Sequence, residues 1–221
     1  MVTNKNVVII GHSPTVLLKA RDIDKYDVVV RLNFGYPRKG MYKYIGKRTD
    51  IWFSWDVWDY NAIKDKFNAK KWISFDKYPR AMFDKLKQEQ GQIKAPTMGM
   101  LAYYYLLEQK PKSISFYGFD FFKTPDFNSP PEVQQQHTRY NKCHDFQREE
   151  LWFWKTKPSF VKFYDENNKE VKEMQKDIKN KAILEPRSTK SIKPSVKVKC
   201  STCGYAENVS RTRCWNCNAE L

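Results

Sequence analysis

The sequence has no long apolar run, which excludes an evident membrane segment. Apolar residues make up 41% of its 221 residues, yet the first apolar run ends after four residues at Gly11. A helix needs about 20 such residues to cross a bilayer, and the first residues do not have the pattern of a secretion signal. We therefore expect a soluble, cytoplasmic protein without a transmembrane segment.

Acidic residues are also scarce. The chain has 25 Asp and Glu residues against 40 Lys and Arg residues, a net charge of +15. Such an excess favours polyanionic partners, namely nucleic acid, an anionic membrane face or nucleotide phosphates. The apolar content is enough for the core of one ordinary domain, so disorder throughout is excluded.

Cysteine is nearly absent before residue 200, where Cys143 is the single example, but four cysteines lie in the last 22 residues. They form two C-x-x-C pairs separated by ten residues, a spacing typical of tetrahedral zinc. With four protein ligands the metal has no open position, so its role is structural, and so short a tail needs it to fold. Two disulfides are the alternative, disfavoured in a reducing compartment. The predicted ligands of this zinc ribbon are Cys200, Cys203, Cys214 and Cys217.

The G-x-G-x-x-G fingerprint is absent, which disfavours a dinucleotide-dependent dehydrogenase. Instead, β-rich runs alternate with helical patterns, which predicts an α/β fold with a Rossmann-like, mostly parallel sheet covered by helices. We expect strands at 7–10, 28–31, 51–55, 72–75 and 114–117, and helices at 15–21, 61–67, 80–88, 98–109 and 165–181.

Composition also predicts the domain organisation. Residues 1–185 form the catalytic domain, and residues 200–221 form the zinc ribbon. Between them, residues 186–199 contain basic residues and two prolines but no acidic residue, which indicates a linker.

The first segment with candidate chemistry lies near the N-terminus. A predicted strand runs into Gly11, His12 and Ser13, a turn whose N–H groups can receive a nucleotide. Arg31 and Asn33 follow at the carboxyl end of the next strand, where open α/β sheets bind ligands.

Two later segments add to these candidates. Thr97 and Gly99 open a helix whose N–H groups and positive dipole end can hold an anion. Further on, His137 and His144 lie seven residues apart, and Glu149 follows the second histidine by five residues. Imidazole titrates near neutrality and is therefore suited to acid–base catalysis.

In order and spacing, these segments resemble the animal-type sialyltransferases, glycosyltransferase family 29. The family's large motif is similar to residues 7–37, with its I-D-x-x-D-V-V-x-R-x-N core, and its small motif to residues 96–119. The very small motif, H-x-x-x-x-E, is matched by His144 and Glu149, and the resemblance covers residues 7–150.

This resemblance implies a sialyltransferase-like variant of the GT-A fold, a CMP-linked sugar donor and catalysis without a metal ion. It assigns His144 as the general base of an inverting transfer, with Glu149 supporting that segment and His137 near the family's third motif. The implied nucleotide contacts are Gly11, His12, Ser13, Arg31, Asn33 and Tyr140, with Thr97 and Gly99 at the phosphate.

Several departures leave the donor sugar open. His12 stands where the family commonly has Asn, and Thr97 with Met98 where it has Ser-Thr. The family's membrane anchor and disulfide have no counterpart here. An aspartate at a predicted strand end, Asp56, Asp59 or Asp120, is an alternative to His144 as the base.

The acceptor also stays open. The charge, the basic linker and the zinc ribbon favour DNA, with sugar transfer to a hydroxymethylated base as in bacteriophages, and hence a bacterial or phage-infected cell. The alternatives are a bacterial surface glycan or lipid-linked saccharide, and a non-catalytic nucleic-acid-binding protein with a transferase-like fold. The oligomeric state is left open by the sequence.

Overall fold

The computed structural model describes residues 2–55, 64–74, 80–91, 94–124, 127, 143–173, 197–199 and 206–208. The chain divides into two compact units, Met1–Ile183 and Leu184–Leu221. Among the helices of these described ranges, none has the length and apolarity required to span a bilayer.

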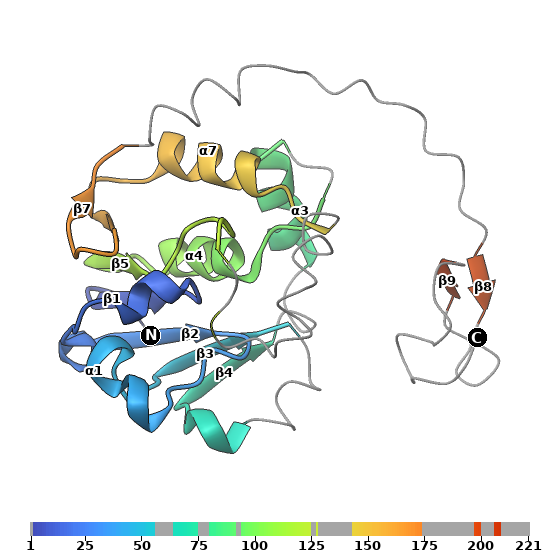
Figure 1. Cartoon of the computed structure of the whole chain (residues 1–221). Helices are drawn as coiled ribbons and strands as arrows, with labels where there is room; N and C mark the ends of the chain where they lie inside the picture. Colours follow the sequence, from blue (N-terminus) through green and yellow to red (C-terminus); the bar gives the residue numbers. More distant parts are fainter. Residues whose placement is uncertain are drawn as a thin grey trace. The chain divides into compact units, whose positions relative to one another are not determined.

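The larger unit is built on a seven-stranded sheet (Figure 1). All neighbouring strands are parallel except β6 and β7, so the predicted mostly parallel sheet is confirmed, together with its five predicted strands. The strands are β1 (Asn6–Ile10), β2 (Val28–Leu32), β3 (Ile51–Ser54), β4 (Lys71–Ser74), β5 (Ser113–Tyr117), β6 (Val161–Tyr164) and β7 (Glu170–Val171).

The strand order β4-β3-β2-β1-β5-β6-β7 contains one reversal of direction. The chain steps outward from β1 to β4 and then returns to the other side of β1 to form β5. In open α/β sheets, ligands bind outside the carboxyl ends of the strands at such a switch point. The topology therefore directs attention to the segments that follow β1, β2 and β5.

Helices cover both faces of the sheet, as buried parallel strands require. One face packs against α3, α4 and α7, and the other against η1, η2 and α1 (Figure 1). On the first face, the rings of Tyr103, Phe116 and Phe153 lie 5.3–5.4 Å apart in edge-to-face contacts. The helices are α1 (Tyr42–Ile45), α3 (Arg80–Glu89), α4 (Met98–Glu108), α7 (Phe146–Thr156), and the 3-10 helices η1 (Pro14–Leu17), η2 (Ile23–Lys25) and η3 (Lys39–Met41).

Two predicted helices differ from the structure. In place of the helix expected at 15–21 the structure has only the short 3-10 helix η1, which Ser13 caps at its start and which ends at Leu17. The one expected from Asp165 is wrong over the residues described there. The Asp165 carboxylate accepts the N–H groups of Asn167 and Lys169 and so fixes a turn that leads into β7.

The smaller unit is described only as a two-stranded antiparallel hairpin, β8 (Lys197–Lys199) and β9 (Ala206–Asn208). The four cysteines predicted to bind zinc lie outside the described residues, so the ribbon stays a prediction.

Candidate functional site

The turn after β1 is tied to the turn after β5. The N–H of Gly11 donates to the carbonyl of Tyr117 over 2.8 Å, and the N–H of Ser13 donates to the carbonyl of Gly118 over 2.9 Å. A Cβ on Gly11 would overlap the backbone carbonyl oxygen of Gly118, so only glycine fits. These two N–H groups join β1 to β5, and the predicted contact of this turn with a nucleotide stays a prediction.

His12 connects the same turn to the end of β2. Its Nε2 lies 3.0 Å from the carbonyl oxygen of Leu32 and, since a carbonyl only accepts, donates to it. The ring fills the space beside Gly35 and contacts the Phe127 ring edge-on at 6.1 Å. His12 therefore fixes the position of the residue that follows Leu32.

That residue is Asn33, which has a positive φ of 38°. Its N–H donates to the carbonyl of Phe53, and its carbonyl accepts the indole N–H of Trp52, each over 2.7 Å. The side-chain amide oxygen is buried and has no hydrogen-bond partner within the described part of the chain. A buried acceptor without a partner is uncommon in native proteins, and here it lies at a strand end where α/β sheets bind ligands.

Arg31 differs from its predicted place as a polar strand exit that contacts the nucleotide. It is fully buried, and its Nε and Nη2 groups donate to the Thr49 hydroxyl and to the carbonyls of Ile45, Gly46 and Arg48. Burial lowers the pKa of the guanidinium to about 10, so it stays charged at neutral pH. Arg31 thus holds the segment before β3 against the sheet.

Thr97 is the N-cap of α4 and is held by Glu149 of α7. The Thr97 N–H and hydroxyl donate to the two carboxylate oxygens of Glu149 over 2.6 and 2.7 Å, and both residues are buried. The Thr97 hydroxyl also accepts the N–H of Met100, which caps the helix.

This pair places a negative charge at the start of α4, where the positive end of the helix dipole stabilises it. The predicted contact of Thr97 with the donor phosphate stays a prediction. Gly99 has a packing role, since a Cβ there would lie 2.7 Å from the Phe119 ring.

His144 lies in a segment that is hydrogen-bonded to the residues just before α4. Its Nδ1 is 2.7 Å from the carbonyl oxygen of Ala95, the N–H of Ala95 donates to the carbonyl of Cys143, and the Lys94 ammonium donates to the His144 carbonyl. A carbonyl partner requires the proton on Nδ1, which leaves Nε2 as an acceptor in the neutral ring. Burial lowers the pKa of His144; the Ala95 hydrogen bond raises it, and the Lys94 charge lowers it further.

The remaining predicted site residues divide into two groups. Asp120 is a turn cap, because its carboxylate accepts the N–H of Thr124 over 2.8 Å and the hydroxyl of the same residue. The other group, His137, Tyr140, Asp56 and Asp59, lies outside the described residues.

Contacts bring the three motifs together at the carboxyl ends of the central strands. The turn after β1 touches Gly118, Phe119 lies against Gly99 at the start of α4, and Glu149 and the His144 segment hold the residues just before that helix. Ala95 was not predicted as part of this arrangement, and Gly118 and Phe119 were predicted only as the end of the small motif, with no role of their own. Gly118 has a positive φ of 71°, and glycine in Y-G-F-D after a strand was the available signal.

Within the ranges that the structure covers, no three His, Cys, Asp or Glu side chains gather in a way that could hold a metal ion.

No protein-family model and no curated protein sequence matches the chain. Among solved structures it is similar to an α-2,3-sialyltransferase from Campylobacter jejuni, with 16% identity, coverage of 76% of this chain and 77% of that one, and a TM-score of 0.49. It is also similar to the sialyltransferase CstII from Campylobacter jejuni in complex with cytidine-5′-monophosphate, with 14% identity, coverage of 81% and 97%, and a TM-score of 0.46. For a mammalian sialyltransferase the identity is 13%, the coverage 73% and 69%, and the TM-score 0.42.

Proposed function

We propose that this protein is an inverting glycosyltransferase that uses a nucleotide sugar and takes His144 as its general base. The observation that carries the proposal is the Nδ1 contact of His144 with the Ala95 carbonyl, which directs the basic lone pair of the neutral ring to Nε2. The order of the three sequence motifs supports the same reaction class.

In the proposed reaction, Nε2 of His144 takes the proton of an acceptor hydroxyl as its oxygen attacks the anomeric carbon of the donor. The bond between that carbon and the nucleotide phosphate breaks, and the nucleotide leaves with the electron pair of this bond. The configuration at the anomeric carbon is therefore inverted. The buried amide oxygen of Asn33 accepts a hydrogen bond from the donor nucleotide. The sequence resemblance supports a CMP-linked donor and a reaction without a catalytic metal.

For the acceptor we propose a hydroxymethylated base in nucleic acid. The excess of positive charge supports this choice, because lysine and arginine side chains bind a phosphate backbone irrespective of its sequence. We further propose that the C-terminal cysteines bind one structural zinc ion, on the strength of their C-x-x-C spacing.

The test is to incubate the purified chain with CMP-linked and other nucleotide sugars and hydroxymethylated DNA, and to follow the DNA by mass spectrometry. The expected product is DNA whose modified base has gained the mass of one sugar. His144→Ala should abolish this gain while the variant still binds CMP, and Lys155→Ala, on the exposed side of α7, should transfer normally. Turnover with a saccharide but not with DNA would overturn the proposed acceptor, and no transfer from any donor would overturn the proposed activity.

A further inference from the structure

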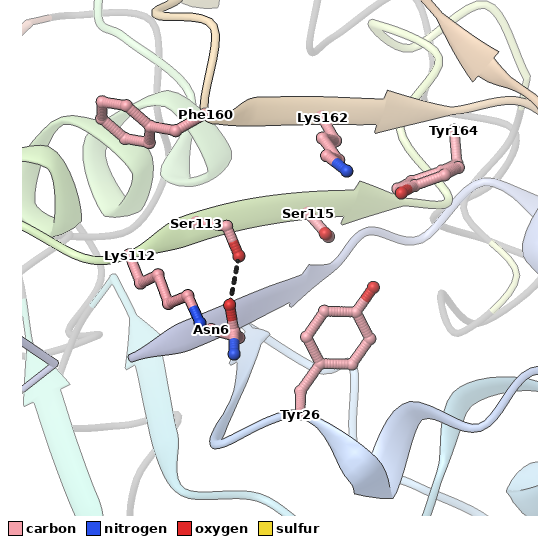
Figure 2. A pocket seen from close by; sticks show the side chains of 8 residues that line it. All are labelled: Asn6, Tyr26, Lys112, Ser113, Ser115, Phe160, Lys162 and Tyr164. Carbon is pink, nitrogen blue, oxygen red and sulfur yellow. Dashed lines mark hydrogen bonds between the residues drawn. The ribbon is translucent and has the colours of Figure 1, made fainter. Parts of the chain in front are cut away.

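A hollow of about 400 Å³ lies on the sheet away from the candidate site. It runs along β5 and β6 on the face opposite α4 and α7, with Asn6 and Ser113 at its amino-terminal end (Figure 2). Its lining residues are Asn6, Tyr26, Lys112, Ser113, Ser115, Phe160, Lys162 and Tyr164.

Side-chain size accounts for the hollow. The register places Ser115 of β5 beside Lys162 of β6, so a small side chain lies next to a long one on this face. The adjoining pair, Ile114 and Val161, packs into the core on the other face. Tyr26, from the connection before β2, forms the opposite wall (Figure 2). On this face η1, η2 and α1 pack over β1 and β2, and within the described residues no helix covers β6.

The charges that line the hollow are of one sign. Lys112 and Lys162 are its only ionised side chains at neutral pH, and no carboxylate is among the lining residues. Asp27 lies near enough to Lys112 for that charge to lower its pKa, but its carboxylate is engaged by the N–H of Asn6. Lys162 is exposed and carries no described ion pair. The hollow is therefore complementary to an anion.

The lining also offers aromatic rings on both sides of a lysine. Lys162 and Tyr164 alternate along β6 and so share one face, with about 7 Å between their side chains. Phe160, in the turn just before β6, lines the same hollow. Phe160 is 37% exposed, and Tyr164 is held in place by stacking on Tyr117 at 4.6 Å between ring centroids. An aromatic ring on each side of an ammonium group fits two bases flanking one phosphate.

We propose that this open face of β5 and β6 binds single-stranded nucleic acid. Bases stack on Phe160 and Tyr164, and Lys162 contacts the phosphate between them. Sheet faces that carry exposed aromatic and basic side chains bind single strands in this way, whatever the sequence. An anionic membrane fits less well, because a concave, hydroxyl-lined trough cannot lie flat on lipid headgroups. The site is independent of the proposed transfer reaction.

The experiment measures binding of a fluorescent oligothymidylate to the full-length chain by anisotropy over a range of salt concentrations. Phe160→Ala should weaken binding about tenfold through loss of one stacked base. Lys162→Ala should reduce the slope of log K against log salt by about 0.7, the value for one phosphate contact with a single strand. Lys162 is exposed and Phe160 is 37% exposed, and thermal unfolding of both variants checks that each is folded before binding is compared.

The matched control is Lys155→Ala, which removes one positive charge from α7 on the opposite face and should keep the parent's slope. Unchanged binding in Phe160→Ala and Lys162→Ala would overturn the proposal. A loss of binding to phosphatidylserine vesicles with oligonucleotide binding intact would also overturn it, in favour of a membrane surface. CMP binding should be unaffected in all three variants, so the outcome is separate from that for the transferase.

Discussion

His144 differs from a surface histidine because its surroundings keep it neutral. Burial lowers its pKa below the usual value of about 6.5. Only the neutral ring can accept a proton, so we expect kcat/KM to rise as the pH increases through this lowered pKa and to be level at neutrality. A pH profile of sugar transfer should therefore have its acidic limb centred below about pH 6.5. A limb centred above that value would contradict this role for His144.

Lys94 provides a second test of the same residue. Its positive charge lowers the pKa of His144, and its ammonium donates to the His144 carbonyl over 3.2 Å. Lys94→Gln keeps a donor but removes the charge, so we expect the acidic limb to move to higher pH. The measurement is the pH profile of this variant beside that of Lys155→Gln, which should keep the parent's midpoint. An equal shift in both variants would show a general charge effect.

The contact between Thr97 and Glu149 makes a prediction for stability. Thr97→Val keeps the shape but removes the hydroxyl that donates to the buried carboxylate and caps α4. An unsatisfied buried acceptor reduces the free energy of unfolding by about 1–3 kcal/mol, and a lost N-cap reduces it by about 0.5–2 kcal/mol. Urea unfolding should detect a loss in this range. Thr97→Ser retains the hydroxyl and should unfold much closer to the parent; an equal loss in both variants would contradict the role assigned to the hydroxyl.

Among the secondary-structure elements, those with simple patterns could be predicted from sequence. Strands β1 and β2 each contain a short apolar run and β5 is rich in aromatic and β-branched residues between two serines, as expected of strands that are largely buried. Helix α7 could not be predicted in the same way, since its buried residues include Glu149 and Glu150 beside Trp152 and Phe153. Two buried carboxylates interrupt the apolar period on which a helix prediction depends, and their partners, Thr97 and Lys123, are distant in sequence.

The site was predictable to a similar extent. The sequence gathers His144, Glu149 and Thr97 into motifs, and the structure brings these residues to one edge of the sheet. What the motifs do not contain is the hydrogen bonding. Arg31 follows three valines on β2, and the sequence predicts a polar residue at the strand exit. Its guanidinium is instead buried against carbonyls that come 14–17 residues later.

The close approach of Gly11 to Gly118, where β1 and β5 end, makes a prediction for the stability of Gly11→Ala. In Gly11→Ala the new Cβ would overlap the carbonyl of Gly118, and both positions are fixed by the parallel pairing of their strands. Overpacking of this kind reduces the free energy of unfolding by about 1–3 kcal/mol. Gly40→Ala is the matched control, because its Cβ would meet nothing within 4 Å. Urea midpoints of the two variants should differ clearly, and equal midpoints would contradict the close approach.

At the scale of the whole molecule, the two compact units differ in what they need to fold. Met1–Ile183 contains a seven-stranded sheet with buried clusters on both faces. Leu184–Leu221 has 38 residues, and chains below about 40 residues seldom fold without metal ions, disulfides or a partner. If the smaller unit folds around the proposed zinc ion, removal of that ion should unfold the smaller unit and leave the stability of the larger one unchanged.

We expect about one zinc ion per chain by elemental analysis, from the single set of four cysteines. Cys214→Ser should lose this zinc, because three thiolates and a hydroxyl bind it far more weakly. Thermal unfolding of the larger unit should be unchanged, since its core contains none of these cysteines. Cys143→Ser is the matched control: Cys143 is exposed and free, so this variant should keep the zinc. Retention of zinc in Cys214→Ser, or a lowered melting temperature of the larger unit, would contradict a structural metal confined to the C-terminal unit.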